Sequence, residues 1–182
     1  MLRIALAIFT GLIGAALLHL IIVLAVPHFS NRDAYTRSLA EGPANTFHLL
    51  KDTRDKAAFG SGDPFMKVAV CTFDIEEMPL RLTAFGNVPF WSIAIYDSAS
   101  NEVFSMNDRT SAEGVMDILV ATPVQLSTIR KAQPAALAQA ILTSSVQTEG
   151  YAVLRTMTPQ SSFVQEAETF LDQAKCQPFQ WQ

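Results

Sequence analysis

Histidine is scarce in this sequence. Only three occur among 182 residues, at His19, His28 and His48. Catalysis by a serine or cysteine nucleophile commonly relies on an imidazole as the activating base. Because residues 49–182 contain no histidine, the sequence argues against a hydrolase of that kind, and we expect neither catalytic residues nor a cofactor.

Side chains that could hold a metal ion are also few. The two cysteines are far apart and have no histidine near them, so they do not supply the four ligands of a zinc site. Three carboxylates, at Asp74, Glu76 and Glu77, are of the type that a hard cation prefers. We interpret them as a solvated hairpin turn between strands at 67–73 and 80–85, and we predict no metal site.

Positive charge is in short supply as well. The chain has 13 Lys and Arg against 17 Asp and Glu, a formal charge of −4. Arg3 is the only charged side chain before His28, so the rest of the chain carries −5. A mildly acidic domain does not attract phosphates, which argues against a nucleic-acid partner.

Charged residues are missing altogether from one long segment, residues 4–27. Its 23 apolar or weakly polar residues up to Val26 would cross a hydrocarbon core of roughly 30 Å as a helix. A cleaved signal peptide usually has an apolar run of only about 7 to 15 residues, although Val23-Leu24-Ala25 does fit a cleavage pattern. We interpret residues 1–27 as a retained transmembrane anchor, with cleavage as the alternative.

The layout of this segment is typical of a signal anchor, with a short charged N-terminus, a long apolar run and then a large domain. It predicts a single-pass protein whose C-terminal domain lies outside the cytoplasm, in the periplasm if the source is a Gram-negative bacterium. Within the anchor, Ala7, Gly11 and Ala15 place three small side chains on one stripe, where another helix could approach closely. Such residues are common in membrane helices in any case.

If the domain is exported, its two cysteines, Cys71 and Cys176, lie in an oxidising compartment. An oxidising compartment allows them to form a disulfide, which would close a loop of about a hundred residues. Two buried free thiols are the alternative, and spacing alone does not decide between them.

Residues 28–63 have mixed charge and turn residues, and we interpret them as a juxtamembrane stalk and linker. A short helix is predicted over 43–59, because Pro43 suits a first helical turn. The remaining residues, 64–182, form the predicted domain.

Short runs of β-branched and aromatic residues, separated by turn residues, fill most of that domain. They predict a mainly β (α+β) fold, a β-sandwich-like or partial-barrel domain with a C-terminal amphipathic helix. The seven predicted strands are 67–73, 80–85, 88–97, 102–106, 115–121, 140–146 and 151–157.

Two of these strands differ in their pattern. The run 88–97 is apolar on both faces, so we expect a central strand. In 80–85, apolar residues alternate with Arg81 and Thr83, which predicts a strand nearer an edge. One short helix is predicted between Pro123 and Pro134.

A longer helix is predicted to follow the last strand, with Thr158 as its cap and Pro159 at its first position. Its apolar stripe should pack on the sheet. The stripe consists of Phe163, Val164, Ala167, Phe170, Leu171 and Ala174. The tail from 176 to 182 is predicted to be extended.

The region 90–109 contains residue types that line ligand pockets on β scaffolds. The alternative is a core strand followed by two polar turns. The candidate ligand-binding residues are Trp91, Tyr96, Asp97, Asn107, Asp108 and Arg109.

Two segments resemble the DUF1254 family. They are "PFWSIAIYDSASNEVFSMND" and "EGYAVLRTMTPQSSFVQEAETFLDQAKCQPF", and the resemblance covers roughly residues 64–179. It implies a compact, mainly β domain with helical additions and implies no activity. Longer members carry a second domain, DUF1214, and for short membrane-anchored members the resemblance implies a separate membrane-anchored partner that supplies it.

These observations lead to two hypotheses about function. The first is a membrane-anchored envelope protein whose exported domain binds another envelope protein. The second is a small-molecule binding or enzymatic domain that uses the 90–109 region. Convergence of the candidate side chains on one pocket would favour the second.

Overall fold

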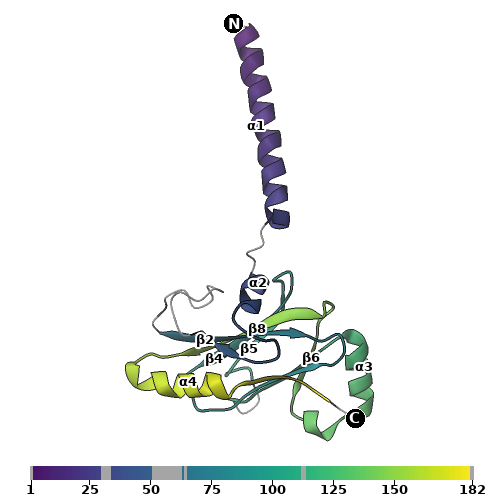
Figure 1. Ribbon diagram of the computed structural model, residues 1–182, viewed down its shortest axis with the longest axis vertical. Coiled ribbons are helices and arrows are strands. Elements are labelled where there is room, and N and C mark those ends of the chain that lie inside the picture. Colours follow the sequence, from purple (N-terminus) through teal and green to yellow (C-terminus); the bar gives the residue numbers. More distant parts are fainter. Residues whose placement is uncertain (1, 30–33, 51–62, 64, 112–113, 181–182) are drawn as a thin grey trace. The chain divides into compact units, whose positions relative to one another are not determined.

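The N-terminal apolar run forms one long helix, α1 (Leu2–Phe29), shown in Figure 1. The structure, a computed structural model, describes residues 2–29, 34–50, 63, 65–111 and 114–180. Within α1, the segment Leu2–Ala25 is long and apolar enough to span a membrane. The chain divides into two units, Met1–Asp33 and Ala34–Gln182.

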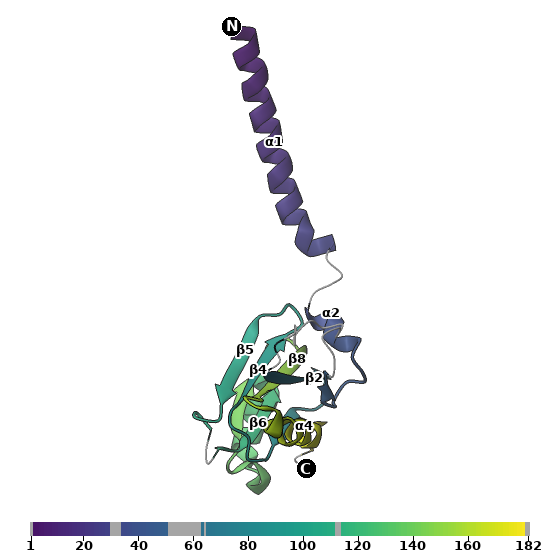
Figure 2. The ribbon, with the colours of Figure 1, turned by 90° about the vertical axis from the view of Figure 1, so that its left-hand side faces the viewer.

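The second unit is an α+β domain with two β-sheets (Figures 1 and 2). Its strands are β1 (His48–Leu49), β2 (Met66–Asp74), β3 (Leu80–Ala84), β4 (Trp91–Asp97), β5 (Glu102–Asn107), β6 (Met116–Ala121), β7 (Ile141–Ser144), β8 (Glu149–Met157) and β9 (Lys175–Pro178). Sheet A is antiparallel, with the strand order β1-β2-β8-β4-β5. Sheet B has the order β7-β6-β3-β9, and only its β6–β7 pair is parallel.

The main hydrophobic core contains side chains from both sheets. In β4, Trp91, Ile93 and Ile95 are buried in this core because alternate residues of a strand face the same way. Ala94 is also buried, so both faces of β4 are largely covered. The strand lies between β8 and β5, as its two-sided apolar pattern predicted.

Helices complete the domain. A short helix, α2 (Ala34–Leu39), precedes the sheets, and α3 (Pro123–Ala132) follows β6, as the two prolines predicted. A 3-10 turn, Ala135–Leu137, follows α3. Helix α4 (Val164–Gln173) buries Ala167, Phe170 and Leu171, so the predicted apolar stripe packs on the core.

All seven predicted strands are present, with ends shifted by up to three residues. Two further strands were not predicted, the two-residue β1 and the four-residue β9. The extended tail thus enters sheet B, where Cys176 lies opposite Leu82 of β3.

The prediction that β3 lies nearer an edge is confirmed, because β3 is next to β9, the edge strand of sheet B. It is not itself the edge, since it is paired with β6 on one side and β9 on the other. The prediction of a hairpin between β2 and β3 is wrong, since the two strands belong to different sheets. The connection between them therefore crosses from one sheet to the other.

The predicted helix over 43–59 is not found in its described part, residues 43–50. That segment hydrogen-bonds to β2 instead, because Asn45 N donates to Thr72 O at 2.8 Å and Leu50 N donates to Val68 O at 2.9 Å. Residues 51–59 lie outside the described residues. Residues 34–50 therefore belong to the domain, which begins at Ala34 and not at residue 64.

The C-terminal helix begins later than predicted. The backbone N–H of Thr158 donates to Phe65 O at 2.7 Å, which continues the pairing of β8 with β2. Thr158 is therefore buried at a strand end and does not cap the helix. A 3-10 turn, Ser161–Phe163, leads into α4 at Val164.

Candidate interaction surface

The six candidate ligand-binding residues do not converge on one pocket. Trp91 is buried at the start of β4, where its indole Nε1 donates to Gly114 O at 3.0 Å. Asn107, at the end of β5, closes a turn by accepting hydrogen bonds at its Oδ1 from the backbone N–H groups of Arg109 and Thr110. In the same turn, Asp108 is half-buried and Arg109 is exposed.

Tyr96 and Asp97 lie at the other end of β4. Tyr96 stacks on Tyr151, with ring centroids 5.0 Å apart, on the face of sheet A away from the main core. The Asp97 carboxylate accepts hydrogen bonds from the backbone and side chain of Asn101 and so shapes the next turn. Asp97 lies six positions after Trp91, about 20 Å along β4, so the two sets of candidates lie at opposite ends of this strand.

The acidic triplet lies in the connection between the two sheets. Asp74 Oδ1 accepts a hydrogen bond from Glu76 N at 2.9 Å, and Glu77 is exposed. Among the residues that the structure describes, no three His, Cys, Asp or Glu side chains are grouped as metal ligands would be. The bond between Asp74 and Glu76 shapes this connection locally.

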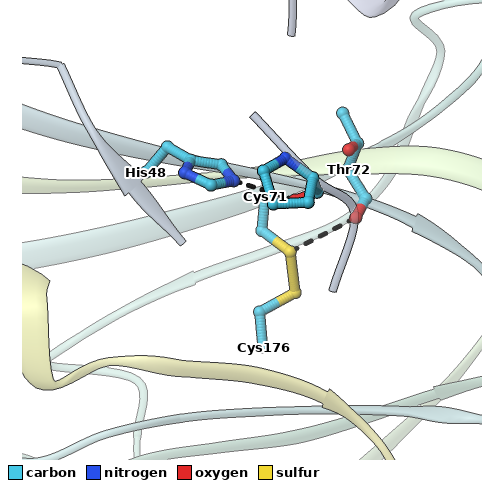
Figure 3. Close-up of a disulfide and its surroundings, with 5 residues drawn as sticks. His48, Cys71, Thr72 and Cys176 are labelled. Atoms are coloured by element: carbon cyan, nitrogen blue, oxygen red, sulfur yellow. Dashed lines mark hydrogen bonds between the residues drawn. A yellow bond between two sulfur atoms is a disulfide. The ribbon is translucent and has the colours of Figure 1, made fainter. Parts of the chain in front are cut away.

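Cys71 and Cys176 form a disulfide, with Cα atoms 6.6 Å apart (Figure 3). The sequence left this pairing and two free thiols open. Cys71 lies on β2 of sheet A and Cys176 on β9 of sheet B, so the bond ties the two sheets together. Both cysteines are buried in the core.

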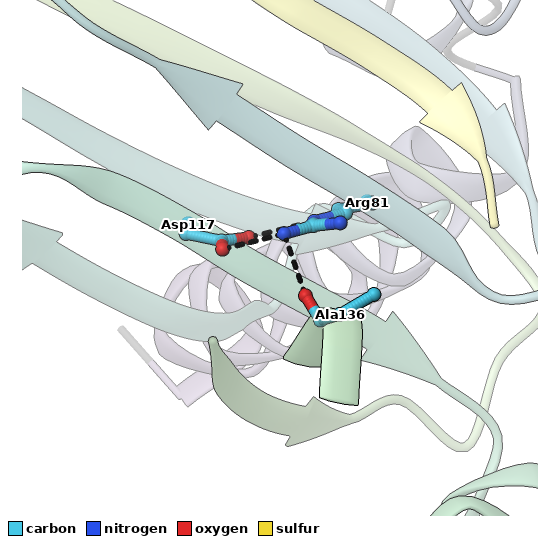
Figure 4. Close-up of polar contacts among 3 residues, drawn as sticks. All are labelled: Arg81, Asp117 and Ala136. Atoms are coloured by element: carbon cyan, nitrogen blue, oxygen red, sulfur yellow. Dashed lines mark hydrogen bonds and ion pairs between the residues drawn. The ribbon is translucent and has the colours of Figure 1, made fainter. Parts of the chain in front are cut away.

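A second polar feature, not predicted from the sequence, lies on sheet B. Arg81 donates two hydrogen bonds to the Asp117 carboxylate, at 2.9 and 2.8 Å, and a third to Ala136 O at 3.0 Å (Figure 4). The hydrogen bond to Asp117 raises the pKa of Arg81 above its ordinary value, against the opposing effect of burial. Arg81 thus stays charged and fastens the 3-10 turn after α3 to the sheet.

Three hollows of the described surface are lined by residues other than the six candidates. The first we call the Phe85 hollow; it has a volume of about 270 Å³. It lies between α4 and the connection from β3 to β4. Its lining is Phe85, Gly86, Asn87, Val88, Gln165, Glu166, Thr169, Phe170 and Gln173.

The second hollow lies on the other side of α4, next to β1, and has a volume of about 570 Å³. It shares Gln165 and Thr169 with the Phe85 hollow, so the two flank one exposed helix face. Glu168 and Asp172 line it. A third hollow, of about 360 Å³, lies between α3 and β7 and includes Arg130.

Large apolar side chains are exposed at the same end of the domain as the Phe85 hollow. Phe65 and Met157 lie where β2 begins and β8 ends, because Met66 is paired with Met157. Phe85 starts the connection that leads to this end of β4, and its side chain is 59% exposed. Contiguous apolar patches mark interaction surfaces, whereas single exposed apolar side chains are common. Phe85 is therefore of interest because it also lines the hollow.

Comparison with known proteins gives the fold and no activity. No protein-family model matches the chain, and no curated protein sequence matches it significantly. The VPA0106 protein of Vibrio parahaemolyticus is similar in structure, with a TM-score of 0.57 and 12% identity, over 80% of this chain and 36% of that one. An uncharacterized protein of Burkholderia cenocepacia is similar with a TM-score of 0.50 and 12% identity, over 82% of this chain and 39% of its own.

These matches show a shared α+β fold. The chain spans well under half the length of either solved structure. In both of those proteins, the matched fold is thus accompanied by a larger stretch of further chain.

Proposed function

We propose that this protein is a single-pass protein of the bacterial inner membrane whose domain, residues 34–182, lies in the periplasm and binds another envelope protein. The observation that carries the proposal is that one chain contains both α1, which is long enough to span a membrane, and a folded domain that exposes an apolar hollow. The domain is the binding module and α1 is its anchor.

The disulfide supports the periplasmic orientation. Disulfides form and persist in oxidising compartments and are rare in the cytosol. The Cys71–Cys176 bond links strands of two different sheets. A domain built in this way fits export better than residence in the cytoplasm.

The partner we propose is a second membrane-anchored protein that carries a DUF1214-like domain. The motif resemblance to DUF1254 supports this choice, because longer members of that family carry the two domains in one chain. The greater length of the two solved structures is consistent with it, since the matched fold occupies only 36% and 39% of them.

Cross-linking in intact cells tests the proposal. The full-length protein with a C-terminal affinity tag is cross-linked, purified under denaturing conditions, and its adducts are identified by mass spectrometry. We expect one envelope protein to be enriched over a control that carries α1 fused to an unrelated periplasmic domain. Recovery of the protein alone with several cross-linkers of different length would contradict the proposal.

A further inference from the structure

We propose that the Phe85 hollow and the acidic residues on the two sides of α4, Glu166, Glu168 and Asp172, form the docking surface for the protein partner, and that the partner inserts a large apolar side chain flanked by Lys or Arg. This inference rests on the proposed function, because it takes for granted that the domain binds a protein. It adds where that protein binds and what chemistry it presents.

The size and lining of the hollow favour an inserted side chain over a small-molecule ligand. Its volume of about 270 Å³ falls just below the usual range for ligand pockets, roughly 300 to 1,000 Å³. Buried Phe170 lines the hollow together with exposed Phe85. A shallow apolar recess of this size suits one anchoring residue of a protein interface.

The hollow is held in shape by close packing at its base. Gly86 has a backbone φ of +154°, and a Cβ atom added there would lie 3.0 Å from Cδ2 of Phe170. The connection from β3 to β4 therefore rests directly on α4. A recess that exists before binding saves the free energy of ordering it.

The negative charge around the hollow indicates which charge the partner should carry. Glu166 lines the Phe85 hollow, and Glu168 and Asp172 line its neighbour on the other side of α4. No Lys or Arg belongs to the described lining of either hollow, and Lys67 reaches this region as the ion-pair partner of Glu168, at 3.2 Å. Complementary charge attracts a basic partner, and the same acidic groups disfavour an anionic lipid surface.

The test places a photoreactive phenylalanine analogue at single positions of the full-length protein in its native membranes. One position is Phe85. The controls are Val124 and Val146, which are apolar and 76% and 88% exposed but lie away from the hollow. Adducts are identified by mass spectrometry after irradiation.

A charge-reversed background tests the chemistry. Glu166→Lys together with Asp172→Lys should lower the yield of the adduct from position 85 by about fivefold or more, through like-charge repulsion. Glu76→Lys with Glu77→Lys makes the same charge change in the exposed connection after β2 and should leave the yield unchanged. If the reversed protein does not fold, Glu166→Gln with Asp172→Asn replaces it, with a smaller decrease expected.

The inference is supported if a partner protein is labelled from position 85 and not from 124 or 146, if the charge reversal lowers that yield, and if the labelled segment holds a large apolar residue beside Lys or Arg. Labelling from 124 or 146 alone would overturn the surface and leave partner binding standing. Labelling of lipid or of a second copy from position 85, or no effect of the reversal, would overturn the assigned partner chemistry. No protein labelled from any of the three positions would count against the proposed function as well.

Discussion

Arg81 shows how the domain accommodates a charged side chain on a largely covered sheet face. Its guanidinium makes a bidentate pair with Asp117 and also bonds the carbonyl of Ala136. It lies 5.6 Å from the ring centroid of Phe179. Since a bidentate, partly buried pair is stronger than an exposed one, this contact joins β3, β6 and the turn after α3 into one structure.

Replacing Arg81 should therefore destabilise the domain. Arg81→Met keeps most of the hydrocarbon chain but leaves the carboxylate of Asp117, 15% exposed, without its partner. We expect the free energy of unfolding to fall by about 1–3 kcal/mol, measured by urea denaturation of residues 34–182. Arg130→Met, at an exposed position on α3, should change it by less than about 0.5 kcal/mol.

The contribution of Arg81 should not depend on pH in the alkaline range. Its raised pKa means that the stabilisation is fully present below the ordinary pKa of an arginine and is lost only as the pH rises through the raised pKa. The difference in unfolding free energy between the parent and Arg81→Met should thus stay constant from about pH 7 to 10. A difference that shrinks steadily over this range would contradict the assignment.

Gly86 is a second residue at which the addition of one atom, a Cβ, should lower the stability of the domain. Gly86→Ala would add a Cβ both in a left-handed backbone region and against the ring of Phe170. We expect the free energy of unfolding to fall by about 1–3 kcal/mol, measured by urea denaturation. Gly114→Ala is the control, because Gly114 has a φ of +74° but open space around it. We expect this variant to lose less unfolding free energy, about 1 kcal/mol. Equal losses would show that the contact with Phe170 contributes nothing.

At the scale of elements, the seven main strands could be predicted because the alternation of apolar and polar residues is a local property of each segment. The strands β1 and β9 could not, since they have two and four residues and are defined by their partners β2 and β3. A contact between residues far apart in the sequence also explains why the start of α4 was predicted too early. Thr158 has the composition of a cap, but its backbone is already bonded to Phe65, about ninety residues earlier.

The proposed interaction surface could not be predicted from the sequence for a related reason. Its two sides, the connection at 85–88 and helix α4, are about eighty residues apart, and only the folded chain brings them together. The six candidates from 91 to 109 have the residue types of a binding site. Trp91 instead lies in the core, Tyr96 lies in a tyrosine stack, and Asp97 and Asn107 each shape a turn.

The disulfide is the covalent contact between the two sheets, and its removal should weaken their association. Cys71→Ala with Cys176→Ala removes a link between residues 105 positions apart. The chain-entropy model predicts a loss of about 4–5 kcal/mol for a loop of this length. Urea denaturation should show it, and a reductant added to the unfolded parent should produce a similar loss while leaving the double variant unaffected. An unchanged midpoint in the variant would show that the sheets hold together without the bond.

At the scale of the whole molecule, the division into an apolar helix and a β-rich domain was predictable, whereas their boundary was not. Residues 34–50 have the mixed composition of a linker, yet α2 and β1 pack and pair with sheet A. In the chain, only residues 30–33 lie between α1 and α2. In the sequence, the apolar helix is thus followed almost at once by the domain that we propose to bind the partner.

The location of each unit in cells can be measured directly and decides whether α1 anchors an exported domain. Membranes are sedimented and extracted with alkaline carbonate, and spheroplasts are treated with a protease added from outside. We expect the unprocessed full-length chain to sediment with membranes, to resist carbonate, and to lose residues 34–182 to the protease before lysis. An unprocessed chain found in the aqueous fraction, or a domain that is protected until the cells are lysed, would contradict this expectation.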